Sequence, residues 1–251
     1  MVLRPFLYAP GSCASYVFGC TTYRKLAVVD AHADLVDEYV ATAAALGSPI
    51  TAVFETHVQA DHLSGLPALV EQTGATAYLP GGAGVEFDHV ALSDGDVVEL
   101  GNTVVTAVAT PGHAPAHHSF AVADRRRGTE EPWLAFTGDS LLVGDVGRPD
   151  LHVAADADGQ ARLLQQSLRR LLTLPDHVIV YPSHYGGSVC GRSLSGNPVS
   201  SIGFERAHNR ILAITDADEF AVALLADAPP APNDQDQIVA ANRSGRLATH
   251  A

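Results

Sequence analysis

Thr56-His57-Val58-Gln59-Ala60-Asp61-His62 is the stretch of sequence that decides the fold of this chain. It directly follows the apolar run Ile50 to Glu55, which is typical of a buried strand, and it precedes an apolar helical stretch that begins near Leu66. A loop that leaves the end of a buried strand can direct alternate side chains the same way, with the aspartate and second histidine at the start of the following helix. The stretch therefore predicts four polar side chains that point into one cavity.

An ordinary capped helix is the alternative interpretation of the same residues. Asp61 would then be the N-cap of the helix, and His57 and His62 would be surface groups with local hydrogen bonds. Two histidines and one aspartate in the six residues 57–62, shortly after a hydrophobic strand, favour the functional interpretation.

Three further polar segments each follow an apolar run that is typical of a strand. Pro-Gly and Gly-Asp are common turn sequences, so each segment alone is consistent with a simple turn. Together with the first stretch, however, they place metal-ligating residue types at four strand ends, and binding residues gather at such ends on one edge of a scaffold. The segments are Thr110-Pro111-Gly112-His113 after Ala109, Thr137-Gly138-Asp139 after Phe136, and Tyr181-Pro182-Ser183-His184 after Val180.

The remaining pattern predicts strands that alternate with helices, then a β-meander, then more helices. This order indicates two packed sheets with helices outside. No fixed repeat or long linker divides the chain, so residues 1–251 are predicted to form one domain with a helical C-terminal portion from about residue 200. The expected strands are 14–19, 26–30, 50–55, 76–79, 97–100, 104–109, 119–123, 133–137 and 178–181, and the expected helices are 35–46, 66–72, 161–172, 201–214, 219–226 and 234–242.

Composition excludes two classes of partner. The chain has 251 residues, 28 acidic against 15 basic side chains and a net charge of −13, which disfavours nucleic acid and anionic membranes as partners. No apolar stretch is long enough to span a bilayer, and Pro5 and Pro10 interrupt the N-terminal region, so we expect a cytoplasmic protein. The three cysteines, Cys13, Cys20 and Cys190, lack CxxC spacing and are expected to be reduced, with buried packing as their usual role.

The four strand-end motifs resemble those of the metallo-β-lactamase superfamily, and the resemblance covers nearly the whole chain. It implies an α+β fold, an αβ/βα four-layer sandwich with a metal site at one edge of two facing β-sheets. Within the superfamily the sequence is most similar to the persulfide dioxygenases, also called sulfur dioxygenases, and next to the glyoxalase II thioesterases. Three blocks carry the first similarity in order and spacing: residues 137–150, 181–191 and 200–206.

One position departs from the superfamily pattern His-x-His-x-Asp-His. Gln59 replaces the second histidine, and a neutral amide is a poor ligand for zinc, so a full binuclear zinc site is not expected. The resemblance to persulfide dioxygenases instead implies a single Fe(2+) per chain, held by His57, His113 and Asp139. Two histidines and one carboxylate are also the ligand set of non-haem Fe(II) oxygenases, which leaves about three open positions for reactants.

The resemblance further implies the reaction and its supporting residues. The substrates would be a low-molecular-weight thiol persulfide, such as glutathione persulfide, and O2, and the products would be sulfite and the free thiol. Asp61, His62 and His184 would orient the ligands and handle protons. Arg148 and Asp150 resemble a family pair near the site, with an ordinary surface ion pair as the alternative interpretation.

Two other functions remain open. A zinc-dependent hydroxyacylglutathione hydrolase could still hold one metal ion with Asp61, His62, His184 and Asp139. A degenerate member would bind a metal ion without catalysis. Members of the family can carry a fused rhodanese domain, which we do not expect in this chain. A sulfur donor would then be a small molecule or a separate protein. The resemblance is also consistent with a homodimer.

The chain has 12 histidines, and the others receive no metal-binding role. His117 and His118 either line the cavity or simply begin the next strand. The rest lack a partner at ligand spacing and are expected to be surface or locally bonded groups: His32, His89, His152, His177, His208 and His250.

Overall fold

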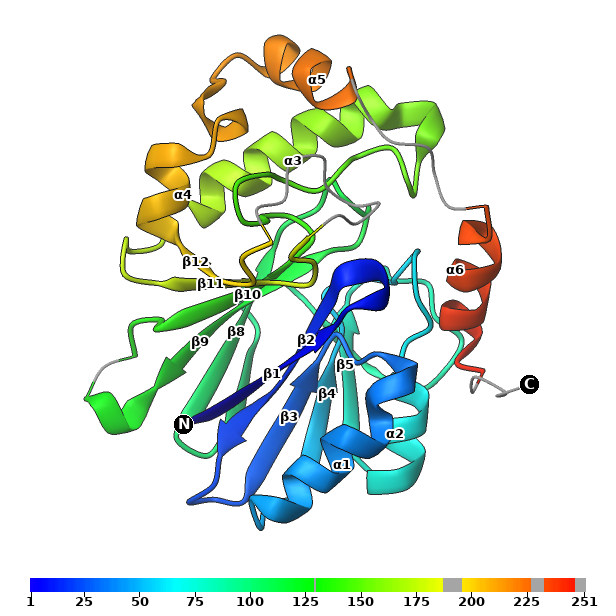
Figure 1. The fold of residues 1–251 in the computed structure, drawn as a ribbon, viewed down its shortest axis with the longest axis vertical. Coiled ribbons are helices and arrows are strands. Elements are labelled where there is room, and N and C mark those ends of the chain that lie inside the picture. Colours follow the sequence, from blue (N-terminus) through cyan, green and yellow to red (C-terminus); the bar gives the residue numbers. More distant parts are fainter. Residues whose placement is uncertain (129, 187–195, 227–232, 247–251) are drawn as a thin grey trace.

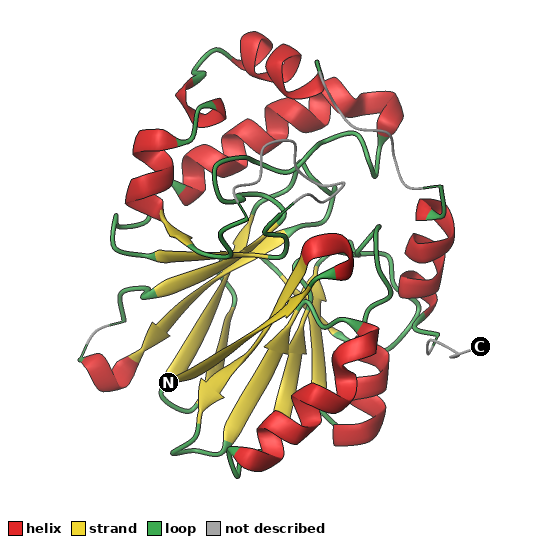
Figure 2. Ribbon diagram, viewed as in Figure 1, coloured by secondary structure: helices red, strands yellow, loops and turns green. Residues whose placement is uncertain are grey.

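Two six-stranded mixed sheets face one another, and helices cover their outer faces (Figure 1, Figure 2). The structure is a computed structural model, and it describes residues 1–128, 130–186, 196–226 and 233–246. The expected αβ/βα sandwich is therefore confirmed.

The first sheet has the strand order β1-β2-β3-β4-β5-β6. Its first three strands are antiparallel, and β3 to β6 are parallel to one another. The helices α1 (Val36–Ala45) and α2 (Leu66–Thr73) follow β3 and β4 and cover the outer face. The strands are β1 (Val2–Tyr8), β2 (Cys13–Cys20), β3 (Lys25–Val29), β4 (Ile50–Phe54), β5 (Thr76–Pro80) and β6 (Val90–Leu92).

The second sheet has the order β12-β11-β10-β9-β8-β7, with a parallel pair at β10 and β11 and antiparallel pairs elsewhere. Its strands are β7 (Val97–Leu100), β8 (Thr103–Ala109), β9 (His118–Asp124), β10 (Leu134–Gly138), β11 (Ile179–Pro182) and β12 (Ser200–Ser201). The helices α3 (Ala157–Leu171), α4 (Ile202–His208) and α5 (Ala217–Leu225) pack on its outer face. The last helix, α6 (Gln235–Ser244), lies beside the first sheet at the right of Figure 1.

Alternation along the strands builds three apolar layers. In β3, Val28 faces α1 and α2, whereas Ala27 and Val29 face the opposite sheet. Because successive side chains of a strand point to opposite faces, one apolar strand supplies both layers. The middle layer is closed by Phe18 and Phe54 from the first sheet and Phe120 from the second, all fully buried.

The observed elements differ from the predicted ones in three ways. Strands β1, β6 and β12 carry no long alternating apolar pattern and were not predicted. The helix expected over residues 201–214 ends at His208 and continues only as a short 3-10 turn, Ile211–Ala213. Helix α2 is preceded by Gly65 as its N-cap, so the interpretation of Asp61 as a helix cap is wrong.

None of the helices in the described ranges is both long and apolar enough to cross a membrane.

A buried aspartate accepts hydrogen bonds from residues of both sheets, at the edge where the polar segments follow the strands. Asp30 follows β3 and accepts hydrogen bonds from the backbone N–H and the hydroxyl of Thr56, at 2.7 and 3.0 Å. Its other oxygen accepts a hydrogen bond from the hydroxyl of Ser183, which follows β11 in the second sheet. Asp30 has a φ of +51°, in the left-handed region that aspartate tolerates better than most residues.

We expect Asp30→Ala to lower the free energy of unfolding by about 2–4 kcal/mol, because it leaves the buried donors of Thr56 and Ser183 without an acceptor. Urea denaturation measures the change. Asp30→Asn is the control, since it keeps an acceptor oxygen and tolerates the same φ, and it should lose markedly less. An alanine variant as stable as the parent protein would show that Asp30 does not connect the sheets.

Candidate metal centre

Four of the predicted residues meet at one edge of the sandwich because the strands that carry them run in the same direction there. His57 follows β4, His113 follows β8, Asp139 follows β10 and His184 follows β11. All four are buried, with exposures of 1% or less. The sequence segments that were singled out for their position after strands therefore come together in space.

His57, His113 and Asp139 form a compact triad. The Nε2 atom of His57 lies 3.9 Å, and that of His113 3.5 Å, from Oδ2 of Asp139. This oxygen is buried and has no hydrogen-bond partner among the residues that the structure describes. An ionised carboxylate oxygen in this position is costly unless a cation or a donor satisfies it. The triad thus fits a metal ion, and its role as the ligand set stays a prediction.

Both histidines are oriented by a partner on the far side of the ring. Nδ1 of His57 contacts the hydroxyl of Thr56 at 3.0 Å, and Nδ1 of His113 contacts the carbonyl of Arg148 at 2.9 Å. Such contacts fix the ring and leave Nε2 available to a metal ion. Burial lowers the pKa of both histidines, most strongly that of His57, so the rings are neutral, which is the form that binds metals.

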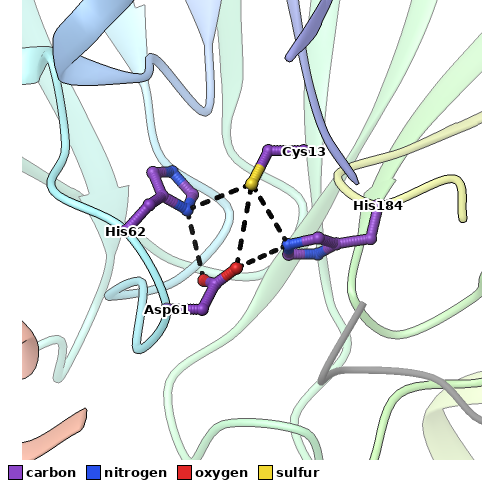
Figure 3. Close-up of side chains that lie close together, drawn as sticks. All are labelled: Cys13, Asp61, His62 and His184. Atoms are coloured by element: carbon purple, nitrogen blue, oxygen red, sulfur yellow. Dashed lines mark hydrogen bonds and ion pairs between the residues drawn. The ribbon is translucent and has the colours of Figure 1, made fainter. Parts of the chain in front are cut away.

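A second polar cluster, which includes Asp61, His62 and His184, is drawn in Figure 3 and is linked to the triad through Asp139. Asp139 Oδ1 contacts Nδ1 of His184 at 2.7 Å, and Nε2 of His184 contacts Asp61 Oδ2 at 2.7 Å. Asp61 in turn contacts Nδ1 of His62 at 3.2 Å. Burial alone would raise the pKa of Asp61, but His184 and His62 outweigh it and hold the pKa well below its usual range. The cluster is a continuous chain of charged and hydrogen-bonded groups that reaches Asp139.

Cys13 also belongs to this cluster, which the sequence analysis missed. Its Sγ lies 3.6 Å from Nε2 of His184 and 3.8 Å from both Nδ1 of His62 and Oδ2 of Asp61. Burial raises the pKa of the thiol, and the two histidines outweigh this and lower it. The expectation of plain buried packing is therefore wrong for Cys13, whereas Cys20 is simply buried. Cys190 lies outside the described residues.

Gln59 lies in a buried and polar part of the loop after β4. The Gln59 amide is buried beside Glu55, whose pKa is raised to about 8 by burial and which also accepts a hydrogen bond from the hydroxyl of Ser64 at 2.6 Å. Asn242 of α6 donates to the carbonyls of Gln59 and His62, at 3.0 and 2.9 Å. These backbone contacts fix the loop between β4 and α2, whereas the two side-chain amide atoms of Gln59 are buried without a hydrogen-bond partner among the described residues.

Arg148 and Asp150 form a bidentate ion pair rather than an ordinary surface pair. Two guanidinium nitrogens of Arg148 donate to the two carboxylate oxygens of Asp150, at 2.8 and 2.6 Å, and Arg148 is 5% exposed. The backbone just before the pair touches the triad: a Cβ on Gly147 would lie 1.8 Å from the carbonyl oxygen of Asp139 and 2.9 Å from Nδ1 of His113. The pair stabilises a turn that closes over the triad.

Three of the remaining histidines, His117, His32 and His152, lie close to residues of the site. His117 is buried, accepts a hydrogen bond from the backbone N–H of Asp139 at 3.2 Å, and contacts the hydroxyl of Thr110 at 2.8 Å, so it supports the site. His32 is locally bonded as expected and also stacks on His62, with ring centroids 4.8 Å apart. The expectation for His152 is wrong, because its ring lies within 6 Å of the rings of both His57 and His113.

Comparison with known proteins gives this arrangement a family. Residues 8–184 match the model of the metallo-beta-lactamase superfamily. The crystal structure of ETHE1 from Myxococcus xanthus is 33% identical, covers 98% of this chain and 100% of that chain, and superposes with a TM-score of 0.85. This chain belongs to the metallo-beta-lactamase superfamily.

Relatives of this superfamily member include two classes of enzyme. The mitochondrial persulfide dioxygenase ETHE1 of Bos taurus is 28% identical over 96% of this chain and 87% of its own length. A hydroxyacylglutathione hydrolase of Cereibacter sphaeroides is 34% identical over 54% of this chain. The chain spans about half the length of that hydrolase, 48%.

We expect Gly147→Ala to lower the melting temperature by roughly 5 °C or more and to weaken metal binding, because the new methyl group would displace Asp139 and His113. Calorimetry and metal titration measure the two effects. Gly159→Ala in α3 is the matched control, since the three atoms nearest to its methyl group all belong to the exposed side chain of Asp156. Equal behaviour of the two variants would contradict the close packing of the turn against the triad.

Proposed function

We propose that this superfamily member is a non-haem iron persulfide dioxygenase that oxidises a low-molecular-weight thiol persulfide with O2. The proposal depends on one observation, the buried pair of histidines that faces a carboxylate oxygen of Asp139 without a hydrogen-bond partner among the described residues. Two imidazoles and one carboxylate suit iron in an oxygenase site. The similarity to a persulfide dioxygenase over 96% of the chain, against 54% for the hydrolase, supports the same choice.

The proposed reaction balances with one water molecule. A thiol persulfide, O2 and water give the free thiol, sulfite and two protons; the terminal sulfur is oxidised, O2 is reduced, and the sulfur–sulfur bond breaks. Iron would be held by His57, His113 and Asp139, and it would supply the positions at which sulfur and O2 bind and a path for electrons from the sulfur to O2. The protein must orient these ligands and remove the protons that the reaction releases.

The polar cluster beside the triad suits this second task. His184 lies between the carboxylates of Asp139 and Asp61, at 2.7 Å from each, so a proton can be held or passed along this line. His62 carries a raised pKa because Asp61 outweighs the effect of burial, and it therefore stabilises the charge on Asp61. Thr56 and the carbonyl of Arg148 keep the two triad histidines in place.

A zinc-dependent thioester hydrolase is the second candidate, and one observation favours it. Cys13, Asp61, His62 and His184 offer ligand atoms that all lie within 4.8 Å of one another, which is the geometry of a further metal position. Zinc there would lower the pKa of a bound water to about 7 and so supply a nucleophile at neutral pH. Gln59 counts against this candidate, because it replaces a histidine that would be a ligand of the first metal ion in a two-zinc hydrolase.

Protein purified without oxygen is expected to contain about one iron per chain and to consume O2 and release sulfite when glutathione persulfide is added. Elemental analysis, an oxygen electrode and sulfite detection measure these quantities. Zinc with cleavage of a glutathione thioester and no O2 uptake would support the hydrolase instead. A bound metal ion with neither O2 uptake nor thioester cleavage would point to a degenerate member of the family.

We expect His113→Ala to abolish iron binding, because it removes one of three ligands, whereas Gln59→Ala should leave iron largely in place. Iron per chain after anaerobic reconstitution and desalting is the measurement. Circular dichroism of both variants controls for folding. Equal loss of iron in the two variants would make Gln59 a ligand and would overturn the proposed coordination.

A further inference from the structure

We infer that His152 is a fourth protein ligand of the metal centre, a third imidazole beside His57, His113 and Asp139. The inference rests on the proposed metal centre and does not depend on which reaction the centre performs. No strand directly precedes His152, so the pattern that located the other ligands could not find it.

The three histidines converge. His57, His113 and His152 each offer a ring nitrogen within 4.8 Å of those of the other two. The ring of His152 is nearly perpendicular to both neighbours, at 80° to His57 and 78° to His113, with centroids 5.9 and 5.6 Å away. Ligands about 2.1 Å from a common ion lie roughly 3 to 4.2 Å apart. A contraction of the cluster by less than about 1 Å on metal binding would bring the three nitrogens to coordination distance.

The surroundings of His152 suit a ligand. Its Nε2 atom is buried and has no hydrogen-bond partner within the described part of the chain. A buried polar atom without a partner calls for a missing water, ion or ligand.

The backbone that precedes His152 is held at several points. The bidentate Arg148–Asp150 pair and the contact of the Arg148 carbonyl with His113 fix the preceding turn. Leu151, the buried residue directly before His152, accepts at its carbonyl a hydrogen bond from the side-chain amide of Gln235 at the start of α6. His152 is therefore presented to the triad by a segment that is anchored at both the triad and α6.

Coordination by His152 would change the number of sites open to reactants. A six-coordinate ion held by two histidines and one carboxylate leaves three positions, whereas a third histidine leaves two. Two positions are enough for one sulfur and one O2, and they would leave no site for a resident water once both reactants bind.

Pulsed EPR of the full chain loaded with one equivalent of Cu(II) counts coordinated imidazoles. We expect three in the parent protein, two in both His152→Ala and His152→Gln, and three in His177→Ala, a control histidine that lies on the surface. The affinity for Fe(II), measured anaerobically against a chelator, should fall about tenfold or more in both His152 variants and stay unchanged in the control.

Two imidazoles in the parent protein, or a count unchanged by both His152 variants, would overturn the inference, even if the affinity fell. The glutamine variant preserves the size of the side chain, so it keeps the test valid if the alanine variant fails to fold. Neither readout uses turnover. Failure of the dioxygenase proposal would appear in O2 uptake, and failure of this inference would appear only in the imidazole count and metal affinity.

Discussion

The carboxylate of Asp30 is the interaction on which the arrangement of the site depends. It is buried between the sheets and binds Thr56 from the first and Ser183 from the second. Each of these residues immediately precedes a histidine of the site, His57 and His184 respectively. A single buried group therefore fixes the relative position of two polar segments that are more than 120 residues apart. The hydroxyl of Thr56, which Asp30 holds, in turn contacts Nδ1 of His57 and fixes its ring. Such a network is stable only when every member is satisfied, which explains why three donors converge on Asp30.

Much of the fold could be predicted from the sequence, because apolar runs of β-branched and aromatic residues mark the central strands. Strands at or near the sheet edges were missed for a physical reason: β1 is partly exposed and contains a proline, and β6 and β12 are only three and two residues long. Their pairing is decided by neighbouring strands rather than by their own pattern.

The site could be predicted where its residues follow strands, and not where they do not. His57, His113, Asp139 and His184 share that position and were found together. Cys13 begins β2, which is antiparallel to β3, so the start of β2 lies at the same edge as the end of β3. Strand direction was the missing signal for Cys13. His152 is presented by a turn whose shape depends on an ion pair and on α6, and no local pattern carries that information.

The placement of α6 has an energetic consequence. Through Asn242 this helix bonds the loop that carries Asp61 and His62, and through Gln235 it bonds the turn that carries His152, yet it contributes none of the metal-ligating groups identified among the described residues. Equilibrium linkage between two binding events is reciprocal. If the helix stabilises the conformation that binds metal, the metal must stabilise the docked helix by the same free energy. Under this condition, occupancy of the metal centre would set how firmly α6 is held against the sandwich.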